Sequence, residues 1–200
     1  MPFGLWYFDS TMLIVIPGIL LALYAQFKVM STYSKYAKVE ASSGMTAGQA
    51  ARRLLDRANL SNVKIEAVPG HLSDHYDPRS KVLRLSAPES RSLSAIGVAA
   101  HETGHALQDA EKYPMLALRS AVVPVAQFAP PIGIILFMIG LIFGRNPFFH
   151  NFMWVGIVFF AAALVFALIT LPVEFDASSR AIRILRESGV AVGEKEIGAP

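Results

Sequence analysis

The chain of 200 residues contains no cysteine. This absence excludes a disulfide framework, a thiolate metal site and a cysteine nucleophile. Any metal ion that the protein binds must therefore be held by His, Asp or Glu side chains.

Charged residues are also scarce. They make up 16% of the chain, against about a quarter in a typical soluble domain, and 54% of the residues are hydrophobic. The net charge is only +3, and no dense run of Lys and Arg alternates with aromatic residues as it does where a protein follows a phosphate backbone. We therefore expect a lipid bilayer as partner and exclude nucleic acid.

Three blocks without charge are long enough to cross the hydrocarbon layer, which takes about 18–20 apolar residues. The first is expected to stay as an anchor, because no basic segment precedes it as in a cleaved signal peptide. The second contains three prolines that should kink or break it, and a short polar turn joins it to the third in an antiparallel helical hairpin. The blocks are residues 10–27, 120–144 and 152–171.

The polar region between the first two blocks has signals for both helices and strands. Thr46 and Gln49 form a capping-box pattern at the start of a predicted helix. VKIEAV and KVLRLS are predicted to be the two strands of a β-hairpin around HLSDHYDPRS, and an Ala-rich helix should follow over 89–109. The predicted fold is therefore mainly α, with three transmembrane helices and a small α+β region at the membrane surface.

The chain is predicted to have four parts, and the positions of basic residues suggest how they are oriented. Lys and Arg flank the polar region and follow the last block, which predicts a multi-pass protein with both of these parts in the cytoplasm. The parts are an N-terminal transmembrane anchor (1–30), the polar region with the predicted β-hairpin (31–117), a transmembrane hairpin (118–171), and a helix with a C-terminal tail (172–200).

The polar region 31–117 contains an HExxH motif, His101 to His105, and is therefore predicted to be a zincin-like catalytic region. On a helix, positions i and i+4 lie on one face, so both imidazoles can reach a zinc ion at about 2.0–2.1 Å. Glu102 lies beside that face, where it can act as general base towards a water molecule. The alternative is a pair of histidines hydrogen-bonded in the core, but two buried imidazoles and a carboxylate are hard to satisfy without a metal.

A catalytic zinc site needs a third protein ligand and an open position. Glu174 and Asp176 follow the last apolar block, and two membrane crossings return the chain to the side of the HExxH helix. Either carboxylate can serve as ligand. Alternatively, both simply begin a helix, where acidic residues favour the positive end of the dipole.

A further cluster, SDHYDP, contains His75 and Tyr76 between Asp74 and Asp77. These side chains can form a second metal site or stabilise an oxyanion, but such clusters are more often hydrogen-bonded turns. The KVLRLS strand is predicted to be a sheet edge that pairs with an extended substrate.

Three strings together, LSDHYDPRSKVLRLS, AIGVAAHETGHALQ and LPVEFDASSRA, resemble the bacterial YugP-like neutral zinc metallopeptidase family. The resemblance implies a membrane-bound, gluzincin-type zinc peptidase with Glu174 as third ligand, and a further apolar segment after the end of this chain. In many gluzincins an aspartate four residues after the ligand glutamate supports a histidine. Ser178 stands at that position here, so Asp109, Asp176 and Ser178 are candidates for the support of the ligands.

These observations predict a zinc-dependent endopeptidase of the bacterial inner membrane that acts on membrane-associated or unfolded proteins. A non-catalytic membrane protein with a structural zinc site is the alternative. Cleavage inside the bilayer is not expected, because the apolar stretch before His101 is too short to span it.

Overall fold

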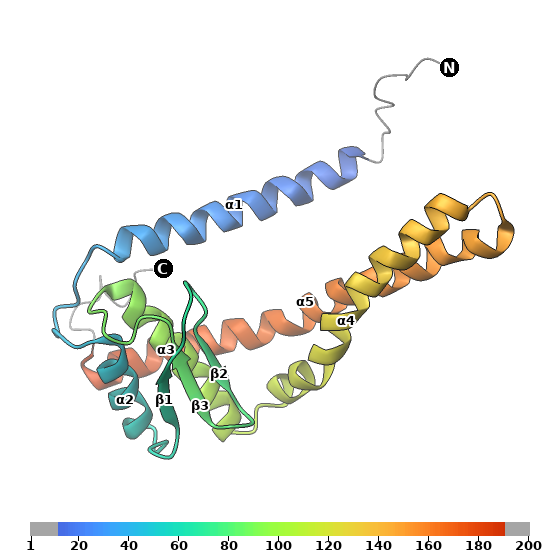
Figure 1. Ribbon diagram of the computed structural model, residues 1–200. Coiled ribbons are helices and arrows are strands. Elements are labelled where there is room, and N and C mark those ends of the chain that lie inside the picture. Colours follow the sequence, from blue (N-terminus) through green and yellow to red (C-terminus); the bar gives the residue numbers. More distant parts are fainter. Residues whose placement is uncertain (1–11, 191–200) are drawn as a thin grey trace.

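The computed structural model describes residues 12–190, and this part of the chain is mainly helical with one small sheet (Figure 1). The predicted combination of mainly α structure with a small α+β region is thereby confirmed. The elements, in order, are α1 (Met12–Tyr36), α2 (Ala47–Arg57), β1 (Lys64–Ala67), β2 (His75–Asp77), β3 (Val82–Leu85), α3 (Leu93–Ala110), α4 (Pro114–Phe143) and α5 (Pro147–Ser188).

A compact α/β body holds the hydrophobic core. It consists of α2, the sheet, α3 and the C-terminal part of α5, and fully buried Leu54, Leu83 and Ala99 belong to the core cluster. α2 begins with the predicted capping box, since Thr46 and Gln49 exchange both hydrogen bonds. Burial of these apolar side chains is the main stabilising contribution to the body.

The sheet differs from the predicted hairpin. Its strand order is β1-β3-β2, with β1 parallel to β3 and β2 antiparallel to β3. The turn joins β2 to β3. In this turn, Asp77 accepts hydrogen bonds from the Arg79 backbone and the Ser80 hydroxyl. Both predicted strands are present, as β1 and β3, but they are parallel, so the predicted hairpin between them was wrong. The predicted edge position of β3 was wrong too, since the edges are β1 and β2.

α4 and α5 form a long helical hairpin that projects from the body (Figure 1). Among the described residues, these two helices are long and apolar enough to cross a membrane. They pack closely through glycines: a Cβ added to Gly133 would lie 2.7 Å from the backbone oxygen of Gly156. The three prolines of α4 do not break it.

α5 is one continuous helix of 42 residues. The sequence divided this stretch at residue 171 into a membrane span and a ligand helix, but the structure joins them without interruption across Pro172. α5 therefore carries both the second arm of the hairpin and Glu174.

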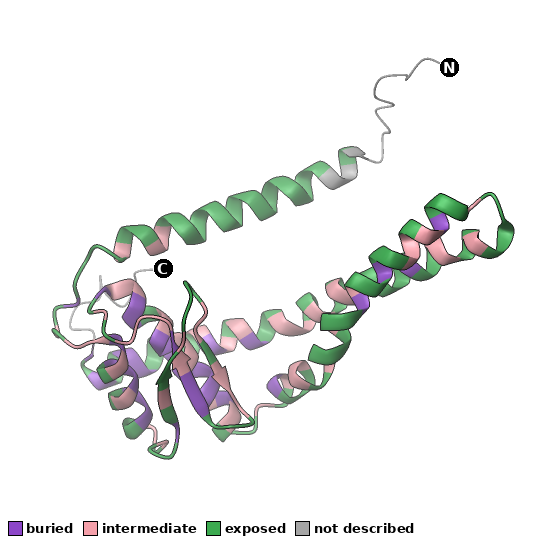
Figure 2. Cartoon of the chain, in the orientation of Figure 1, coloured by how far each residue is buried: buried purple, intermediate pink, exposed green. Residues whose placement is uncertain are grey.

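α1 projects from the body towards the same side as the α4–α5 hairpin (Figure 1). Nearly all of its described side chains are exposed (Figure 2), and its C-terminal end contacts α3. The first two residues of the predicted 10–27 span lie outside the described residues. The third transmembrane helix therefore stays a prediction.

Candidate metal centre

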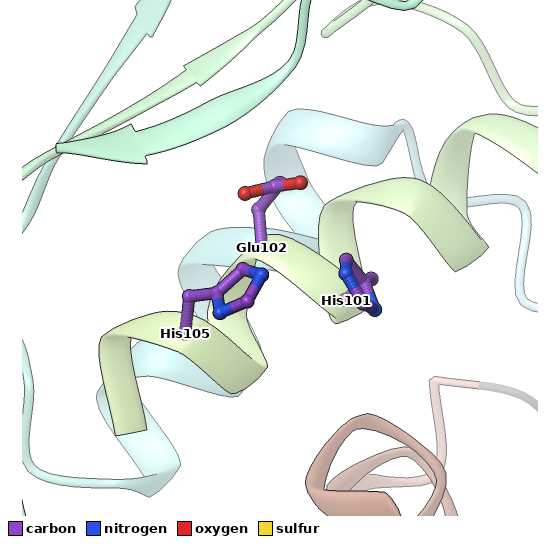
Figure 3. Close-up of side chains that lie close together, drawn as sticks. All are labelled: His101, Glu102 and His105. Carbon is purple, nitrogen blue, oxygen red and sulfur yellow. The ribbon is translucent and has the colours of Figure 1, made fainter. Parts of the chain in front are cut away.

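The HExxH motif lies in the middle of α3. The helix begins after Ser92, whose hydroxyl accepts a hydrogen bond from the backbone of Ala95. His101 and His105 lie one turn apart with ring centroids 4.9 Å from each other, and Glu102 points from the same helix towards the strands (Figure 3). One potential ligand atom from each of these three residues lies within 4.8 Å of the others, so the cluster could hold a metal ion.

Glu174 brings a carboxylate to this cluster from α5. Its Oε2 lies 3.1 Å from His101 Nε2 and 3.5 Å from His105 Nε2. In a tetrahedral zinc site with bonds of about 2.0–2.1 Å, neighbouring ligand atoms are about 3.3–3.4 Å apart. Both nitrogen–oxygen distances are therefore close to the spacing expected between two ligands of one zinc ion.

Glu174 follows the charge-free stretch 152–171, and its surroundings favour the ionised form. Hydrogen bonds from His101 and His105 hold the pKa of the Glu174 carboxyl far below its usual range, and Arg119 adds to this shift. Arg119 Nη2 lies 3.5 Å from Oε1, the carboxylate oxygen that is turned away from the histidines. This contact between Arg119 and Glu174 was not predicted from the sequence, where Arg119 is one of the basic residues that flank an apolar block.

The second ring nitrogen of each histidine also has a partner. His101 Nδ1 lies 3.2 Å from the Ser178 hydroxyl, and His105 Nδ1 lies 3.0 Å from Gln108 Oε1. Such contacts fix the ring orientation and direct Nε2 of each ring towards a metal. Ser178 was a candidate from the sequence, whereas Gln108 was missed, although its position three residues after His105 on the same helix face was a usable signal.

Gln108 connects the site to Asp176. The buried amide donates hydrogen bonds of 2.8 Å to both the Val173 carbonyl and Asp176 Oδ2. Asp176 also pairs with Arg180 at 2.5 Å. Asp176 is thus bonded to Gln108, the residue that contacts His105. Glu174 itself faces both histidines.

Tyr76 and Asp109 lie on the other side of Glu102. The Tyr76 backbone N–H donates a 2.9 Å hydrogen bond to Glu102 Oε2, and its hydroxyl donates one of 2.6 Å to Asp109 Oδ2. Lys81 also pairs with Asp109. Burial and the nearby Asp109 raise the pKa of Tyr76 well above its usual value, so the hydroxyl stays protonated. These contacts fasten β2 to α3 beside Glu102.

His75 makes contacts with the sheet and the loop before it. Its Nδ1 lies 2.9 Å from the Ser73 carbonyl oxygen, and its Nε2 lies 3.4 Å from Arg84. Asp74 accepts two hydrogen bonds from Ser86. Within residues 12–190, neither of these two contacts of His75 involves a histidine of the HExxH motif.

Comparison with known proteins gives a direct result. The profile of a family described as "Putative neutral zinc metallopeptidase" matches residues 11–199. The chain belongs to this family. Membership in a zinc metallopeptidase family agrees with the cluster of His101, Glu102 and His105, which could hold a metal ion.

A relative supports the same assignment. The chain is 49% identical over 180 residues to the "Putative membrane protease YugP" of Bacillus subtilis (strain 168), covering 89% of this chain and 78% of that protein. No solved structure matches. The chain is thus a member of a zinc metallopeptidase family with a relative that is named as a membrane protease, in accord with the two apolar helices α4 and α5.

Proposed function

We propose that the protein is a zinc-dependent, membrane-bound endopeptidase of the gluzincin type that cleaves membrane-associated or unfolded proteins. The observation that carries this proposal is the convergence of His101 and His105 on α3 with Glu174 on α5. Glu102 lies next to them on α3. His101 Nε2, His105 Nε2 and Glu174 Oε2 would hold the metal. Zinc bound there would polarise the scissile carbonyl and favour ionisation of a water molecule.

Glu102 performs the proton transfers in this proposal. Its carboxylate takes a proton from the attacking water and passes it to the leaving nitrogen, while the new C–O bond forms and the C–N bond breaks. The Tyr76 backbone N–H holds Oε2 of this carboxylate at 2.9 Å. The bond fixes the orientation of the base and leaves Oε1 to act on water.

Asp176 is a poorer third ligand than Glu174. Its carboxylate is already bonded to Gln108 and Arg180. Use of Asp176 as a ligand would require breaking its hydrogen bond with Gln108, the residue that contacts His105. Glu174 already lies at zinc-ligand spacing from both histidines.

A non-catalytic structural site is less well supported than a catalytic one. A closed zinc site needs a fourth side-chain ligand, and Glu102 is the nearest candidate. The hydrogen bond to Tyr76 directs the Glu102 carboxylate towards β2 instead. This arrangement suits a base beside an open metal position.

The proposed setting is the bacterial inner membrane, with α1, α4 and α5 crossing it and the catalytic region in the cytoplasm. The apolar composition of α4 and α5, and the Lys and Arg residues around the body, support this orientation. The lipid bilayer is then a permanent partner, and protein or peptide chains are the substrates.

Hydrolysis tests the proposal directly. Purified protein with zinc should cleave casein or a fluorogenic peptide, and Glu102→Gln should retain stoichiometric zinc while losing hydrolysis by several orders of magnitude. The reason is that this change removes the base but no proposed ligand. Glu187→Gln, an exposed change at the end of α5, is the control. Full activity of Glu102→Gln would refute the assigned role.

A further inference from the structure

A largely apolar cavity of about 550 Å³ adjoins the HExxH motif. Val29 and Tyr33 on α1 form one wall, and the first half of α3 and Ile182 on α5 form the others. His101 and Glu102 line the same cavity. Its volume lies within the range of about 300–1,000 Å³ that is usual for ligand pockets.

Gly97 on α3 has no packing role that explains its size. It lines the cavity, and a Cβ added there would meet no atom within 4 Å. Gly104, on the same helix, is different, because its Cβ would overlap the backbone oxygen of Ala177. Glycine destabilises the middle of a helix relative to alanine. Folding thus accounts for Gly104 but not for Gly97.

The presence of a glycine at position 97 is better explained by its place next to the cavity than by packing. It lies four residues before His101, and therefore on the same face of α3. A side chain at this position would project into the space next to the proposed ligand. The absence of a side chain keeps the cavity open up to His101.

The chemistry of the walls selects an apolar occupant. Ile96 and Leu185 are buried in the wall, and the exposed Ile182 is a third aliphatic contribution. Outside the HExxH motif, two charged residues also line the cavity: Asp74, whose carboxylate is already bonded to Ser86, and Lys28, which is exposed to solvent. An apolar side chain gains from leaving water here, whereas a charged one would lose its hydration.

We propose that this cavity is a substrate subsite that receives a large apolar side chain next to the scissile bond. The inference rests on the proposed peptidase function and extends it to a substrate class: polypeptides with a large apolar residue at the cleavage position. Continuity of the cavity with Glu102 and His101 carries the assignment. α1 is then a wall of the subsite in addition to being an anchor.

Binding can be measured without hydrolysis in a Glu102→Gln background. Two fluorescent peptides that differ only in one position, Phe or Ala, are titrated against the zinc-loaded, detergent-solubilised protein. The parent should bind the Phe peptide more tightly. Gly97→Leu should lower the ratio of Phe to Ala affinity by at least tenfold, because filling an apolar pocket typically changes selection about 10- to 200-fold.

Two further variants complete the test. Val29→Trp narrows the cavity from the α1 side and should lower the ratio in the same direction. Gly18→Leu is the matched control: it is also a glycine with open space around it, but it does not line the cavity, so the ratio should not change.

The two proposals fail in different ways. An unchanged ratio in both Gly97→Leu and Val29→Trp would overturn the subsite, even if the wild-type protein hydrolyses peptides. A ratio that shifts as expected, with no hydrolysis by the wild-type protein, would support the subsite and overturn the peptidase function. Should Gly97→Leu not fold, Val29→Trp decides the result alone.

Discussion

Both ring nitrogens of His101, and both of His105, contact neighbouring side chains. Glu174 lies at the Nε2 side of both rings, while Ser178 and Gln108 contact the Nδ1 atoms. A ligand ring held from both sides needs little reorganisation when a metal binds. The supporting residues should therefore contribute to zinc affinity although they do not touch the metal.

Ser178→Ala is expected to weaken zinc binding about tenfold or more, since loss of an outer contact to a ligand typically costs 10- to 100-fold in affinity. Competition with a zinc chelator measures the effect. Ser179→Ala is the matched control, because the Ser179 hydroxyl donates its hydrogen bond to the Phe175 carbonyl on the same helix. Equal zinc affinity of Ser178→Ala and Ser179→Ala would show that the contact to His101 has no such role.

At the scale of residues, the sequence predicted those site residues that belong to a short sequence pattern. The spacing of His101, Glu102 and His105 follows directly from helix geometry, and the structure places Ser178 against His101. Gln108 and Arg119 could not be assigned so easily, because their contacts depend on how α3, α4 and α5 meet. Such contacts have no short-range pattern.

The packing of α3 against α5 positions the site at the scale of elements. Gly104 permits this approach, because any Cβ there would overlap the backbone of Ala177. The two helices carry the histidines and Glu174 respectively. Their separation therefore sets the spacing between the proposed ligands.

Gly104→Ala should lower the free energy of unfolding by about 1–3 kcal/mol, the usual cost of adding atoms to a tightly packed contact. It should also weaken zinc binding, since α3 and α5 must move apart. Thermal unfolding with and without zinc measures both effects. Gly97→Ala is the control on the same helix, where the Cβ meets open space and the melting temperature should not fall. A Gly104→Ala protein as stable as Gly97→Ala would contradict the close contact.

The elements were predicted unequally well from the sequence. Helices with strong caps or long apolar runs were recognised, as Thr46 and Gln49 illustrate for α2. Two strands of the sheet were predicted and are found as β1 and β3. The third strand and the pairing were not predicted, because β2 has only three residues and the parallel pairing of β1 with β3 joins segments that are not adjacent in the chain. Short strands of this kind acquire their partners from tertiary packing.

At the scale of the whole molecule, the α/β body lies at one end of α5 and the hairpin turn at the other (Figure 1). In the proposed orientation, Glu174 follows the apolar stretch of α5 by less than one turn. The metal site would then lie at the cytoplasmic membrane surface. Flexible tails and unfolded loops could reach it more easily than intact transmembrane helices.

Labelling of single cysteines tests this orientation, because the chain has no cysteine of its own. We expect Ser61→Cys and Glu187→Cys to react with an impermeant maleimide only after cells are permeabilised, and His150→Cys to react in intact cells. All three side chains are exposed. The reverse pattern would show an inverted protein, and different labelling of Ser61→Cys and Glu187→Cys would refute the two-span hairpin.

The central claim is that Glu174 joins His101 and His105 as a zinc ligand across α3 and α5. Zinc content of purified Glu174→Ala and Asp176→Ala, measured by atomic emission against the wild-type protein, tests it most directly. The account predicts that Glu174→Ala loses most of its zinc, whereas Asp176→Ala keeps far more because it alters only the support of His105. Stoichiometric zinc in Glu174→Ala together with loss of zinc in Asp176→Ala would contradict it.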